Sequence, residues 1–426
     1  MKNQILRCTC VDMSVEGLGI ARADKLVIFV KGLIKGEEAD VKIISEKKNY
    51  SIAIIDKLIK PSPYRIGSKC PIAYKCGGCD YRHIDYKYQM ELKKEVLINT
   101  FPGYKVNDVL ACEDPFYYRN KVQIPVADHK MGFYRKFSND IVEFDDCLIE
   151  SKIANEMIRD LKSLLLNTSK EKYIRHILIK HGKGSGEVML GFIVNDLSVD
   201  LIDICEEMVG KYPQIVSVIL NLNDKKTNVI LGDEEKVLYG RDFIYDDFAG
   251  IKVKVSLKSF YQVNHDQMIR LYDVARNLAE IDETKDVLDL YCGIGTISLY
   301  LSRYAKHVTG VEIVESAVRN AKDNAKLNDI DNCDFILADA SKGMDRYLKD
   351  KDVVILDPPR KGISKDLIDS LKNNKIKKIV YVSCNPATLA RDLELMKDTY
   401  RIGEIYPVDM FPYTIHTECV TVLDLK

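Results

Sequence analysis

Hydrophobic and polar positions alternate in short runs over residues 1–60 of this 426-residue chain. The segments KLVIFVKGLI and EADVKIISEKKNYSIAIIDKLI are rich in β-branched residues, and glycines separate the runs. Such a pattern predicts short strands joined by tight turns, and several of them in so short a segment predict a small β-barrel. Pro61-Ser62-Pro63 ends this unit and indicates a linker.

Residues 61–255 mix the two periodicities in no regular order. The stretch YKYQMELKKEVLINTF and segments near 150–167 and 197–211 show helical spacing. Between them lie the apolar runs KVQIPVA, RHILIKHG, EVMLGFIVN and SVILNLN, which read as strands. We expect a central α+β domain.

From about residue 266 the pattern becomes regular. Short apolar runs such as VLDL, HVTGVE, VVIL and KIVYVS alternate with longer segments that have one apolar face. Strands that alternate with amphipathic helices are typical of a doubly wound parallel sheet. We therefore expect a C-terminal α/β domain over residues 256–426.

Composition indicates the cellular class of the protein but does not indicate which molecule it binds. The chain has 63 Lys+Arg and 64 Asp+Glu, a net charge of −1, so charge alone does not indicate nucleic acid. No apolar run approaches the ~20 residues that span a bilayer, and the first residues lack the features of a secretory signal. We expect a cytoplasmic protein without a membrane partner.

A glycine-rich loop follows the first strand of the α/β domain. It reads Asp289-Leu-Tyr-Cys-Gly-Ile-Gly-Thr296, and Glu312 ends the next strand, where an acid can bind ribose hydroxyls. A dinucleotide fingerprint needs a third glycine where this chain has Ser298. An adenosyl ligand without pyrophosphate, such as S-adenosylmethionine, therefore fits better than NAD or FAD.

Three further strand ends carry candidate chemistry. Asp339 ends the third strand and is either an adenine-binding acid or an ordinary loop acid; Asp357-Pro-Pro-Arg360 forms a stiff loop after VVIL. Cys384 follows KIVYVS in a polar loop, as a reactive thiol would. Glu418, before the last apolar segment, is a candidate general base.

A cysteine cluster lies between the barrel and the central strands. Cys70, Cys76 and Cys79 have the spacing C-x5-C-x2-C, and in a reducing compartment such clusters hold zinc or an Fe–S cluster. The alternative is three buried cysteines without a metal. Cys147 and Cys112 are the candidates for a fourth ligand, and spacing alone does not choose the metal.

Taken together, the motifs D-x-Y-C-G-x-G, D-P-P-R-x-G, S-C-N-P and H-x-E resemble those of the RNA (uracil-5-)-methyltransferases, and most of all the 23S rRNA enzymes of that family. The resemblance implies an N-terminal TRAM (OB-like) RNA-binding barrel over residues 1–60 and a central α+β domain with an Fe–S site over residues 61–255. It implies a Rossmann-like class I methyltransferase domain over 256–426, against which a helix near 86–112 would pack. The tRNA enzyme of the family typically lacks the barrel and the cluster, which favours 23S rRNA over tRNA.

The resemblance also implies roles for single residues. Cys384 would attack C6 of uracil, and Glu418 would remove the C5 proton. The segment Ser259-Phe-Tyr-Gln-Val-Asn264 matches the family's S-x-x-Q-x-N, which places Gln262 at the site and leaves Phe260 to stack on the extruded base. S-adenosylmethionine would contact Gln262, Tyr291, Thr296, Glu312, Asp339 and Asp357.

For the cysteine cluster the resemblance implies a [4Fe–4S] cluster held by Cys70, Cys76, Cys79 and Cys147, with zinc as the alternative. Two aromatic and basic segments, residues 116–121 and 132–136, either contact RNA or pack as strands. We expect a monomer. The competing reading from another class is an RNA-binding Fe–S protein without turnover.

Overall fold

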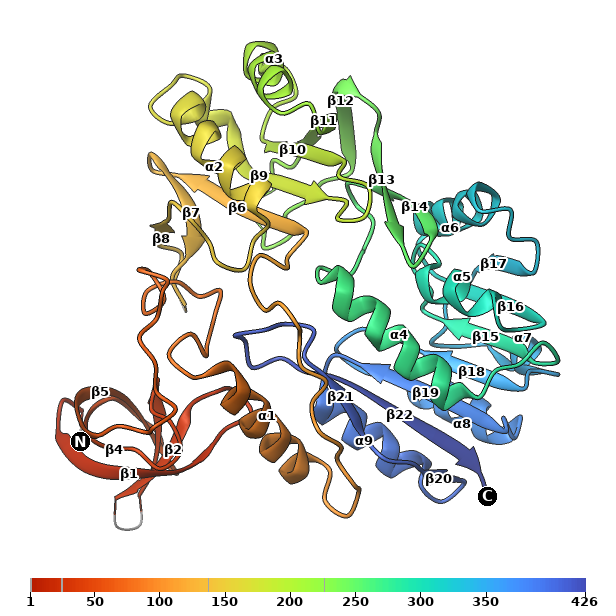
Figure 1. Ribbon diagram of the computed structural model, residues 1–426, viewed down its shortest axis with the longest axis horizontal. Coiled ribbons are helices and arrows are strands. Elements are labelled where there is room, and N and C mark those ends of the chain that lie inside the picture. Colours follow the sequence, from red (N-terminus) through yellow and green to blue (C-terminus); the bar gives the residue numbers. More distant parts are fainter. Residues whose placement is uncertain (1, 24–25, 137, 226) are drawn as a thin grey trace.

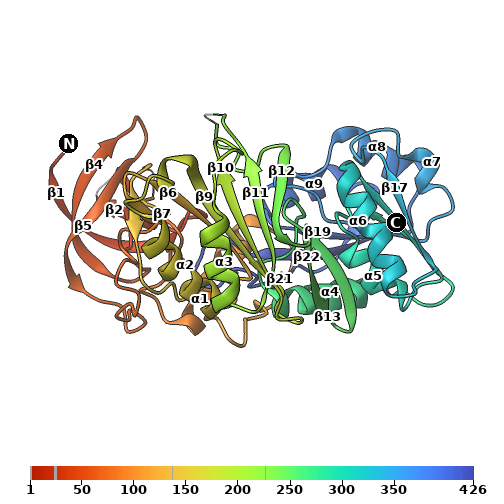
Figure 2. The ribbon, with the colours of Figure 1, turned by 90° about the horizontal axis from the view of Figure 1, so that it is seen from above.

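The computed structural model describes residues 2–23, 26–136, 138–225 and 227–426. The chain forms three parts: an N-terminal barrel, a central sheet with its helices, and a C-terminal α/β domain. In Figure 1 the central part lies at the top, the barrel at the lower left and the C-terminal domain at the right, and Figure 2 shows the barrel and the C-terminal domain at opposite ends of the molecule. Within the described ranges, no helix has both the length and the apolar character needed to cross a lipid bilayer.

The N-terminal part is a closed five-stranded barrel with strand order β1-β2-β3-β5-β4, and β4 pairs with β1 to close it. Alternate residues such as Ile28, Val30, Val41 and Ile43 fill its interior, because successive side chains of a strand point to opposite faces. The predicted barrel is confirmed; Lys25 of the expected strand KLVIFVKGLI lies outside the described residues. The strands are β1 (Ile5–Met13), β2 (Gly19–Ala23), β3 (Leu26–Lys31), β4 (Glu38–Glu46) and β5 (Ser51–Lys60).

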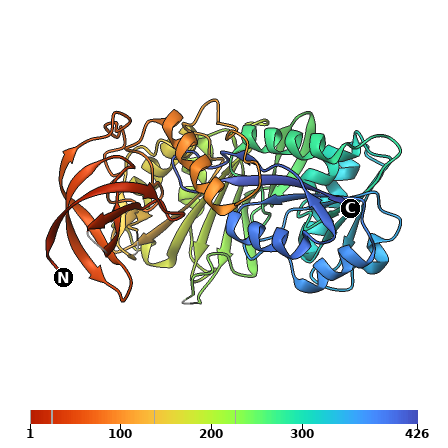
Figure 3. The ribbon, with the colours of Figure 1, turned by 90° about the horizontal axis from the view of Figure 1, so that it is seen from below.

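Helix α1 (Tyr86–Thr100) follows the cysteine-rich loop and lies between the barrel and the C-terminal domain (Figure 3). The expectation of a helix near 86–112 is wrong in its length. Phe101 precedes Pro102 and Gly103 has φ 86°, and both features end a helix. The chain turns at residues 101–104, and beyond the turn Val106 and Leu110 form parallel bridges to the C-terminal domain.

The central part is a seven-stranded sheet of order β12-β11-β10-β9-β6-β7-β8. Two helices, α2 and α3, cover one face and share a hydrophobic core with the middle strands. On the other face, Leu178, Met189 and Ile219 belong to the core of the C-terminal domain. The elements are β6 (Lys121–Ala127), β7 (Lys130–Tyr134), β8 (Ile141–Glu143), α2 (Lys152–Leu165), the 3-10 turn η1 (Glu171–Tyr173), β9 (Ile174–His181), β10 (Val188–Val194), α3 (Ile202–Lys211), β11 (Ile215–Leu222) and β12 (Glu234–Gly240).

A two-stranded hairpin, β13 (Phe243–Phe248) and β14 (Ile251–Ser256), connects the central sheet to the C-terminal domain. Its buried residues Phe248 and Val253 belong to one hydrophobic cluster with the helices that follow. The hairpin therefore packs with the C-terminal domain, although it precedes residue 256.

The C-terminal part is an eight-stranded sheet in which β17-β16-β15-β18-β19 are parallel and β22 is antiparallel to β19. Helices α4, α5 and α6 share a core with one face, and α7, α8 and α9 share a core with the other, as the doubly wound pattern predicts. The elements are α4 (His265–Ala279), β15 (Asp286–Leu290), α5 (Thr296–Ser302), β16 (His307–Glu312), α6 (Glu315–Leu327), β17 (Cys333–Leu337), α7 (Asp345–Leu348), β18 (Val353–Leu356), α8 (Lys365–Asn373), β19 (Lys378–Ser383), α9 (Pro386–Met396), β20 (Tyr400–Ile402), β21 (Tyr406–Val408) and β22 (Glu418–Leu425).

Candidate active site

The sheet topology brings several of the predicted residues to one edge. Glu312 ends β16, Asp357 follows β18 and Cys384 follows β19, and these strands run parallel through β15. Open α/β sheets bind their ligands at the carboxyl ends of their strands. Strand β22 runs the other way, so its first residue, Glu418, reaches the same edge.

Cys384 and Glu418 are neighbours across two strands. The antiparallel ladder pairs Ser383 of β19 with Cys419 of β22, so the next position along each chain sets Cys384 against Glu418. Residues opposite each other in such a ladder have Cβ atoms about 5 Å apart. The charge of Glu418 accordingly contributes to raising the pKa of the Cys384 thiol, after burial.

The acids at this edge are held in a poorly solvated environment. Burial and the charge of Asp357 raise the pKa of Glu418 to about 8, while the nearby charge of Arg360 opposes this shift. Burial raises the pKa of Asp357 to about 7. Burial, followed by the charges of Glu418 and Asp357, raises the pKa of Cys384 to about 11, and Arg360 again opposes it. Strongly perturbed carboxyl groups gathered in one place are typical of functional sites.

Two loops that carry these groups are tied together. The side-chain amide of Asn385 donates to the Arg360 carbonyl oxygen at 2.9 Å, and the Thr388 hydroxyl donates to the same oxygen at 3.2 Å. Asn385 also caps α9 by accepting a hydrogen bond from the Ala387 amide at 3.2 Å. Cys384 thus sits just before the N-terminus of a helix, whose partial positive charge favours a thiolate.

The glycine loop has the backbone that its sequence predicts. Gly293 and Gly295 have φ values of 56° and 84°, and a Cβ on Gly295 would lie 2.7 Å from the Phe335 ring. The amide of Gly293 donates to Glu312 at 3.1 Å, which holds that carboxylate beside the loop. The Thr296 hydroxyl is 2.7 Å from the hydroxyl of Tyr272.

Asp289 lies beneath this loop as a buried carboxyl. One oxygen accepts a hydrogen bond from Ser298 at 2.5 Å, and the other oxygen, Oδ1, is buried without a hydrogen-bond partner. Burial, opposed by the Ser298 hydrogen bond and assisted by the charge of Asp357, raises its pKa to about 7. Such a group gains stability from a bound cation or donor.

Tyr291 follows β15 and Asp339 follows β17, and the two are close enough for the charge of Asp339 to act on Tyr291. Asp339 accepts hydrogen bonds from the amide and the hydroxyl of Ser341 at 2.9 and 2.6 Å, which lower its pKa. Its charge contributes to raising the pKa of Tyr291 to about 12, after burial. Tyr291 has φ 70°, a left-handed conformation that is uncommon for a tyrosine.

The segment Ser259–Asn264 connects β14 to α4 and contacts the central part through Asn120. Gln262 is buried, and its carbonyl oxygen accepts a hydrogen bond from Asn120 at 3.0 Å. The side chain of Phe260 is 70% exposed, a feature that a base-stacking surface requires.

Several residues that bind this segment belong to no motif and were not predicted from the sequence. The buried amine of Lys180 donates to the carbonyl oxygens of Ser256 and Ser259 at 2.7 and 2.8 Å, and Asn320 donates to the Ser259 hydroxyl at 3.1 Å. Asp246 accepts a hydrogen bond from Tyr261 at 2.9 Å. The sequence offers one indication of this role: Lys180 lies inside the apolar run RHILIKHG. A lysine is rarely buried without a partner, so its position predicts a buried hydrogen-bonding partner.

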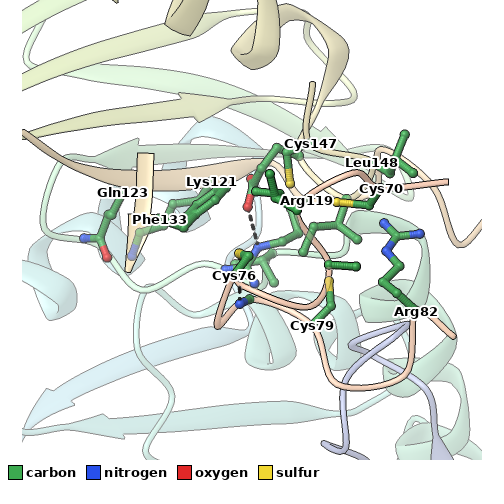
Figure 4. Close-up of a pocket in the computed structure, with 16 residues that line it drawn as sticks. Cys70, Cys76, Cys79, Arg82, Arg119, Lys121, Gln123, Phe133, Cys147 and Leu148 are labelled. Carbon is green, nitrogen blue, oxygen red and sulfur yellow. Dashed lines mark hydrogen bonds and ion pairs between the residues drawn. The ribbon is translucent and has the colours of Figure 1, made fainter. Parts of the chain in front are cut away.

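The four cysteines of the predicted metal site line one cavity of about 270 Å³ (Figure 4). Cys70, Cys76 and Cys79 come from the loop before α1, and Cys147 comes from the segment before α2. Cys112 lies elsewhere, buried within 3.6 Å of the Asn264 side-chain amide. Among the described residues, no group of three or more His, Cys, Asp or Glu side chains has the geometry to hold a single metal ion.

This cavity is not an ordinary apolar void. Arg119 and Glu150 form an ion pair of 3.3 Å at its wall, and Lys121 and Arg82 also line it. Burial raises the pKa of Cys79 to about 11, and the charge of Arg82 opposes that shift. Cationic side chains beside thiols suit an anionic set of thiolates.

The cysteine loop also touches the segment that leads to Glu418. The amides of Asp80 and Tyr81 donate to the Tyr413 carbonyl oxygen at 2.9 and 3.0 Å, and the Arg82 guanidinium lies 3.9 Å from the centre of the Tyr413 ring. In addition, Asp80 accepts a hydrogen bond from the Ile415 amide at 3.3 Å. The cysteine loop therefore supports residues 413–415.

Both aromatic and basic segments pack against neighbouring parts of the fold. Phe116 packs against Tyr413 with ring centres 5.5 Å apart, and Arg119 pairs with Glu150, so residues 116–121 are largely structural. Phe133 stacks on Phe144 with ring centres 4.6 Å apart in the central core. These contacts favour the packing alternative, although only the second segment lies mainly in a strand, β7, and residues 116–120 precede β6.

Sequence comparisons identify relatives over the whole chain. The sequence model of the tRNA (uracil-5-)-methyltransferase family matches residues 85–426, and that of the TRAM domain matches residues 1–55. An uncharacterized RNA methyltransferase of Bacillus cereus is 39% identical and covers 99% of this chain and 97% of that protein. One from Staphylococcus aureus is 38% identical and covers 100% and 99%.

A solved structure shows the same three-part arrangement. The Pyrococcus abyssi tRNA (uracil-54, C5)-methyltransferase, in complex with S-adenosyl-L-homocysteine, superposes with a TM-score of 0.81 and 29% identity. The match covers 98% of this chain and 100% of that one. A tRNA enzyme thus shares the barrel, so the presence of the barrel does not by itself favour rRNA. By its sequence and its fold, this chain belongs to the tRNA (uracil-5-)-methyltransferase family of RNA methyltransferases.

Proposed function

We propose that the protein transfers a methyl group from S-adenosylmethionine to C5 of a uridine in RNA, with Cys384 as nucleophile and Glu418 as base. The observation that carries this proposal is the register of β19 and β22, which sets the thiol against the carboxyl group. Arg360, whose charge acts on both groups, favours their ionised forms.

The chemistry explains why a thiol and a carboxyl group are needed together. C5 of uracil is a weak nucleophile. When the Cys384 thiolate adds to C6, the electron pair of the C5=C6 bond moves onto C5 and the C4 carbonyl to give an enolate. C5 then attacks the methyl group, and the sulfur of the donor leaves with its bonding pair as a thioether.

The second half of the reaction releases the enzyme. The Glu418 carboxylate takes the proton from C5, the C5=C6 bond re-forms, and the Cys384 thiolate leaves C6. A carboxylate with a pKa near 8 is a stronger base than an ordinary glutamate, which suits this step. The product is 5-methyluridine in the RNA.

The methyl donor carries a positive sulfonium, and the proposed site is rich in acids. Asp289 and Asp357 have raised pKa values, so a cation between them would be favourable. We assign the ribose hydroxyls to Glu312, at the end of β16. We assign the remaining contacts to Gln262, Tyr291, Thr296 and Asp339.

The target base must leave its stack before Cys384 can reach it. Extrusion of a base costs a few kcal/mol, which an aromatic side chain partly offsets by stacking. Exposed Phe260, two residues from Gln262, is the proposed stacking partner.

We also propose that Cys70, Cys76, Cys79 and Cys147 hold a [4Fe–4S] cluster. The residues fit this group: four thiols surround one cavity, and Arg82 and Lys121 at its wall would offset the cluster's negative charge. Each thiolate of such a cluster binds a different iron, so the thiols need not converge on one point as they must for zinc. The cluster would support the surrounding loop and take no part in methyl transfer.

Two RNA classes are candidates for the substrate. The motifs resemble those of the 23S rRNA enzymes most closely, so we propose 23S rRNA. The full-length similarity to a tRNA (uracil-54, C5)-methyltransferase favours tRNA as the second candidate.

One experiment tests the reaction and the substrate together. Anaerobically purified protein is incubated with methyl-labelled S-adenosylmethionine and unmodified 23S rRNA or tRNA. Label recovered as 5-methyluridine from rRNA supports the full proposal, and label in tRNA alone assigns the substrate to tRNA. Label in neither RNA, with RNA binding intact, would contradict the proposal and support the reading as a binding protein without turnover.

A further inference from the structure

A second cavity, of about 240 Å³, opens beside Cys384 where the barrel, helix α1 and the C-terminal domain meet. The barrel contributes Ser14 and Val15 from the turn after β1. Helix α1 contributes Val96 and Thr100, and the C-terminal domain contributes Arg360 with residues 384–387 and 415–417. Ribbon views from two directions show α1 between the barrel and the C-terminal domain (Figures 1 and 3).

This cavity is separate from the proposed position of the target uracil. Cys384 lines it, but Gln262, Asp357 and Glu418 do not. A uracil undergoing methylation must contact the carboxyl group of Glu418 and the methyl donor, and neither Glu418 nor the proposed contacts of the donor, Gln262 and Asp357, line this cavity. The cavity is then adjacent to the target uridine without being its binding site.

The lining of the cavity has the chemistry of a nucleotide site. Val15, Ile415 and Pro386 offer apolar surface. The charge of Lys93 is balanced by Asp409, with which it forms an ion pair of 2.5 Å. Exposed Arg360 therefore supplies the uncompensated positive charge at the cavity. Burial and the charge of Arg360 lower the pKa of His416, which leaves a neutral ring at the wall.

The barrel turn after β1 lies close against Ile415, in the segment that leads to Glu418. The Ser14 hydroxyl accepts a hydrogen bond from the Leu18 amide at 3.1 Å, which fixes the turn. Gly17 has φ 74°, and a Cβ there would lie 2.3 Å from the Ile415 side chain, so the turn approaches residue 415 as closely as glycine allows. Lys35 of the barrel also pairs with Glu95 of α1 at 2.8 Å.

We propose that this cavity binds a nucleotide directly adjacent to the target uridine in the RNA strand. Its base packs between Val15 and Ile415, and its phosphate faces Arg360. The barrel turn thereby takes part in selecting the RNA sequence beside the target. This inference rests on the proposed function, because it assumes a target uridine at Cys384.

The test uses two valines of the same barrel. Val15→Trp fills the cavity, whereas Val11→Trp places the same side chain on β1, away from it; both positions are exposed, at 65% and 48%, so neither change disturbs the core. Each variant and the wild type are assayed with the RNA fragment that the wild type methylates. Matched RNAs lack the base at the target position, at the 5′ neighbour or at the 3′ neighbour, and their binding is measured with S-adenosylhomocysteine, so that no turnover occurs.

We expect Val15→Trp to weaken binding of the intact RNA by about tenfold, which is the scale of one lost base-stacking contact. With the RNA that lacks one neighbouring base, the wild type should bind about tenfold more weakly, and Val15→Trp should cause no further loss. Val11→Trp should match the wild type with every RNA.

Three results would overturn the inference. If Val15→Trp weakened the binding of every RNA equally, its effect would not depend on a neighbouring base. If Val15→Trp caused no further loss only with the RNA that lacks the target base, the cavity would bind the target base itself. Wild-type binding for Val15→Trp would leave the cavity unused by RNA. These failures occur with an active wild-type protein, whereas failure of the proposed function is the absence of methyl transfer by the wild type itself.

Discussion

Cys384 lies opposite Glu418, one position beyond the ladder pair of Ser383 and Cys419, although the two are 34 positions apart in the sequence. Strand β19, which is parallel to its other neighbour, and strand β22, which is antiparallel to β19, thus place a thiol and a carboxyl group side by side. The pairing depends on β22 entering the sheet in the opposite direction to its neighbour, and each predicted step of the reaction depends on that pairing.

Replacement of Glu418 by glutamine should separate the two halves of the reaction. Glu418→Gln keeps the shape of the side chain but cannot accept the C5 proton, so we expect turnover to fall by about a hundredfold or more. A methylated covalent complex with ordinary RNA should accumulate, detectable by its slower migration in a denaturing gel. Glu404→Gln, at a surface carboxylate paired with Lys105, is the matched control and should behave as the wild type. Loss of turnover without any covalent complex would contradict the role of base.

The two steps should also differ in their pH dependence. Release of the RNA from the covalent complex needs the Glu418 carboxylate, whose pKa is raised to about 8, so its rate should rise with pH and level off above about 8. Single-turnover methyl transfer needs the Cys384 thiolate, whose pKa is raised to about 11, so its rate should still rise at pH 9. Rates of release that stay constant or fall between pH 6 and 8 would rule out Glu418 as the base.

Much of this site is predictable because local sequence patterns encode it. Gly293 and Gly295 predict a tight turn after a strand. Because ligands bind at the carboxyl ends of parallel strands, Glu312, Asp357 and Cys384 are then predicted to lie at the site. The barrel is equally local, since alternation and glycine turns define its strands.

The supports of the site are not predictable in this way. Lys180 meets Ser256 and Ser259 only after two domains have packed, and Lys93 meets Asp409 across more than 300 residues of chain. The hydrophobic pattern of the sequence does not predict contacts between residues so far apart in the chain. The bounds 86–112 follow from the family resemblance and are wrong at their C-terminal end. The local pattern YKYQMELKKEVLINTF, residues 86–101, agrees with α1, because Pro102 and Gly103 end the helix.

The contact between Arg82 and Tyr413 should link the cysteine loop to the active site. A cation over an aromatic ring contributes about 0.5–2 kcal/mol, so Arg82→Met should slow turnover about two- to thirtyfold and increase hydrogen exchange of residues 411–417. Arg276→Met removes a similar contact, 4.7 Å from the Tyr304 ring centre, far from the site, and should change neither measurement. Unchanged exchange in Arg82→Met would show that the cysteine loop does not support this segment.

The choice of fourth cysteine ligand can be tested with two single substitutions. Cys147→Ser should lose most of the iron and acid-labile sulfide from anaerobically purified protein, because Cys147 lines the cavity shared by the other three cysteines. Cys112→Ser should retain both, since that thiol lies beside Asn264 instead. One zinc per chain, without iron or sulfide, would contradict the proposed cluster.

The most direct test of the account is to trap the covalent complex. RNA with 5-fluorouridine at the target position should react with the protein and S-adenosylmethionine to form a stable adduct, because fluorine at C5 leaves Glu418 no proton to remove. Mass spectrometry should locate the adduct on Cys384, Cys384→Ala should form none, and Cys205→Ala, a thiol buried in α3, should form it normally. An adduct that persists in Cys384→Ala, or normal methyl transfer by that variant, would contradict the central claim.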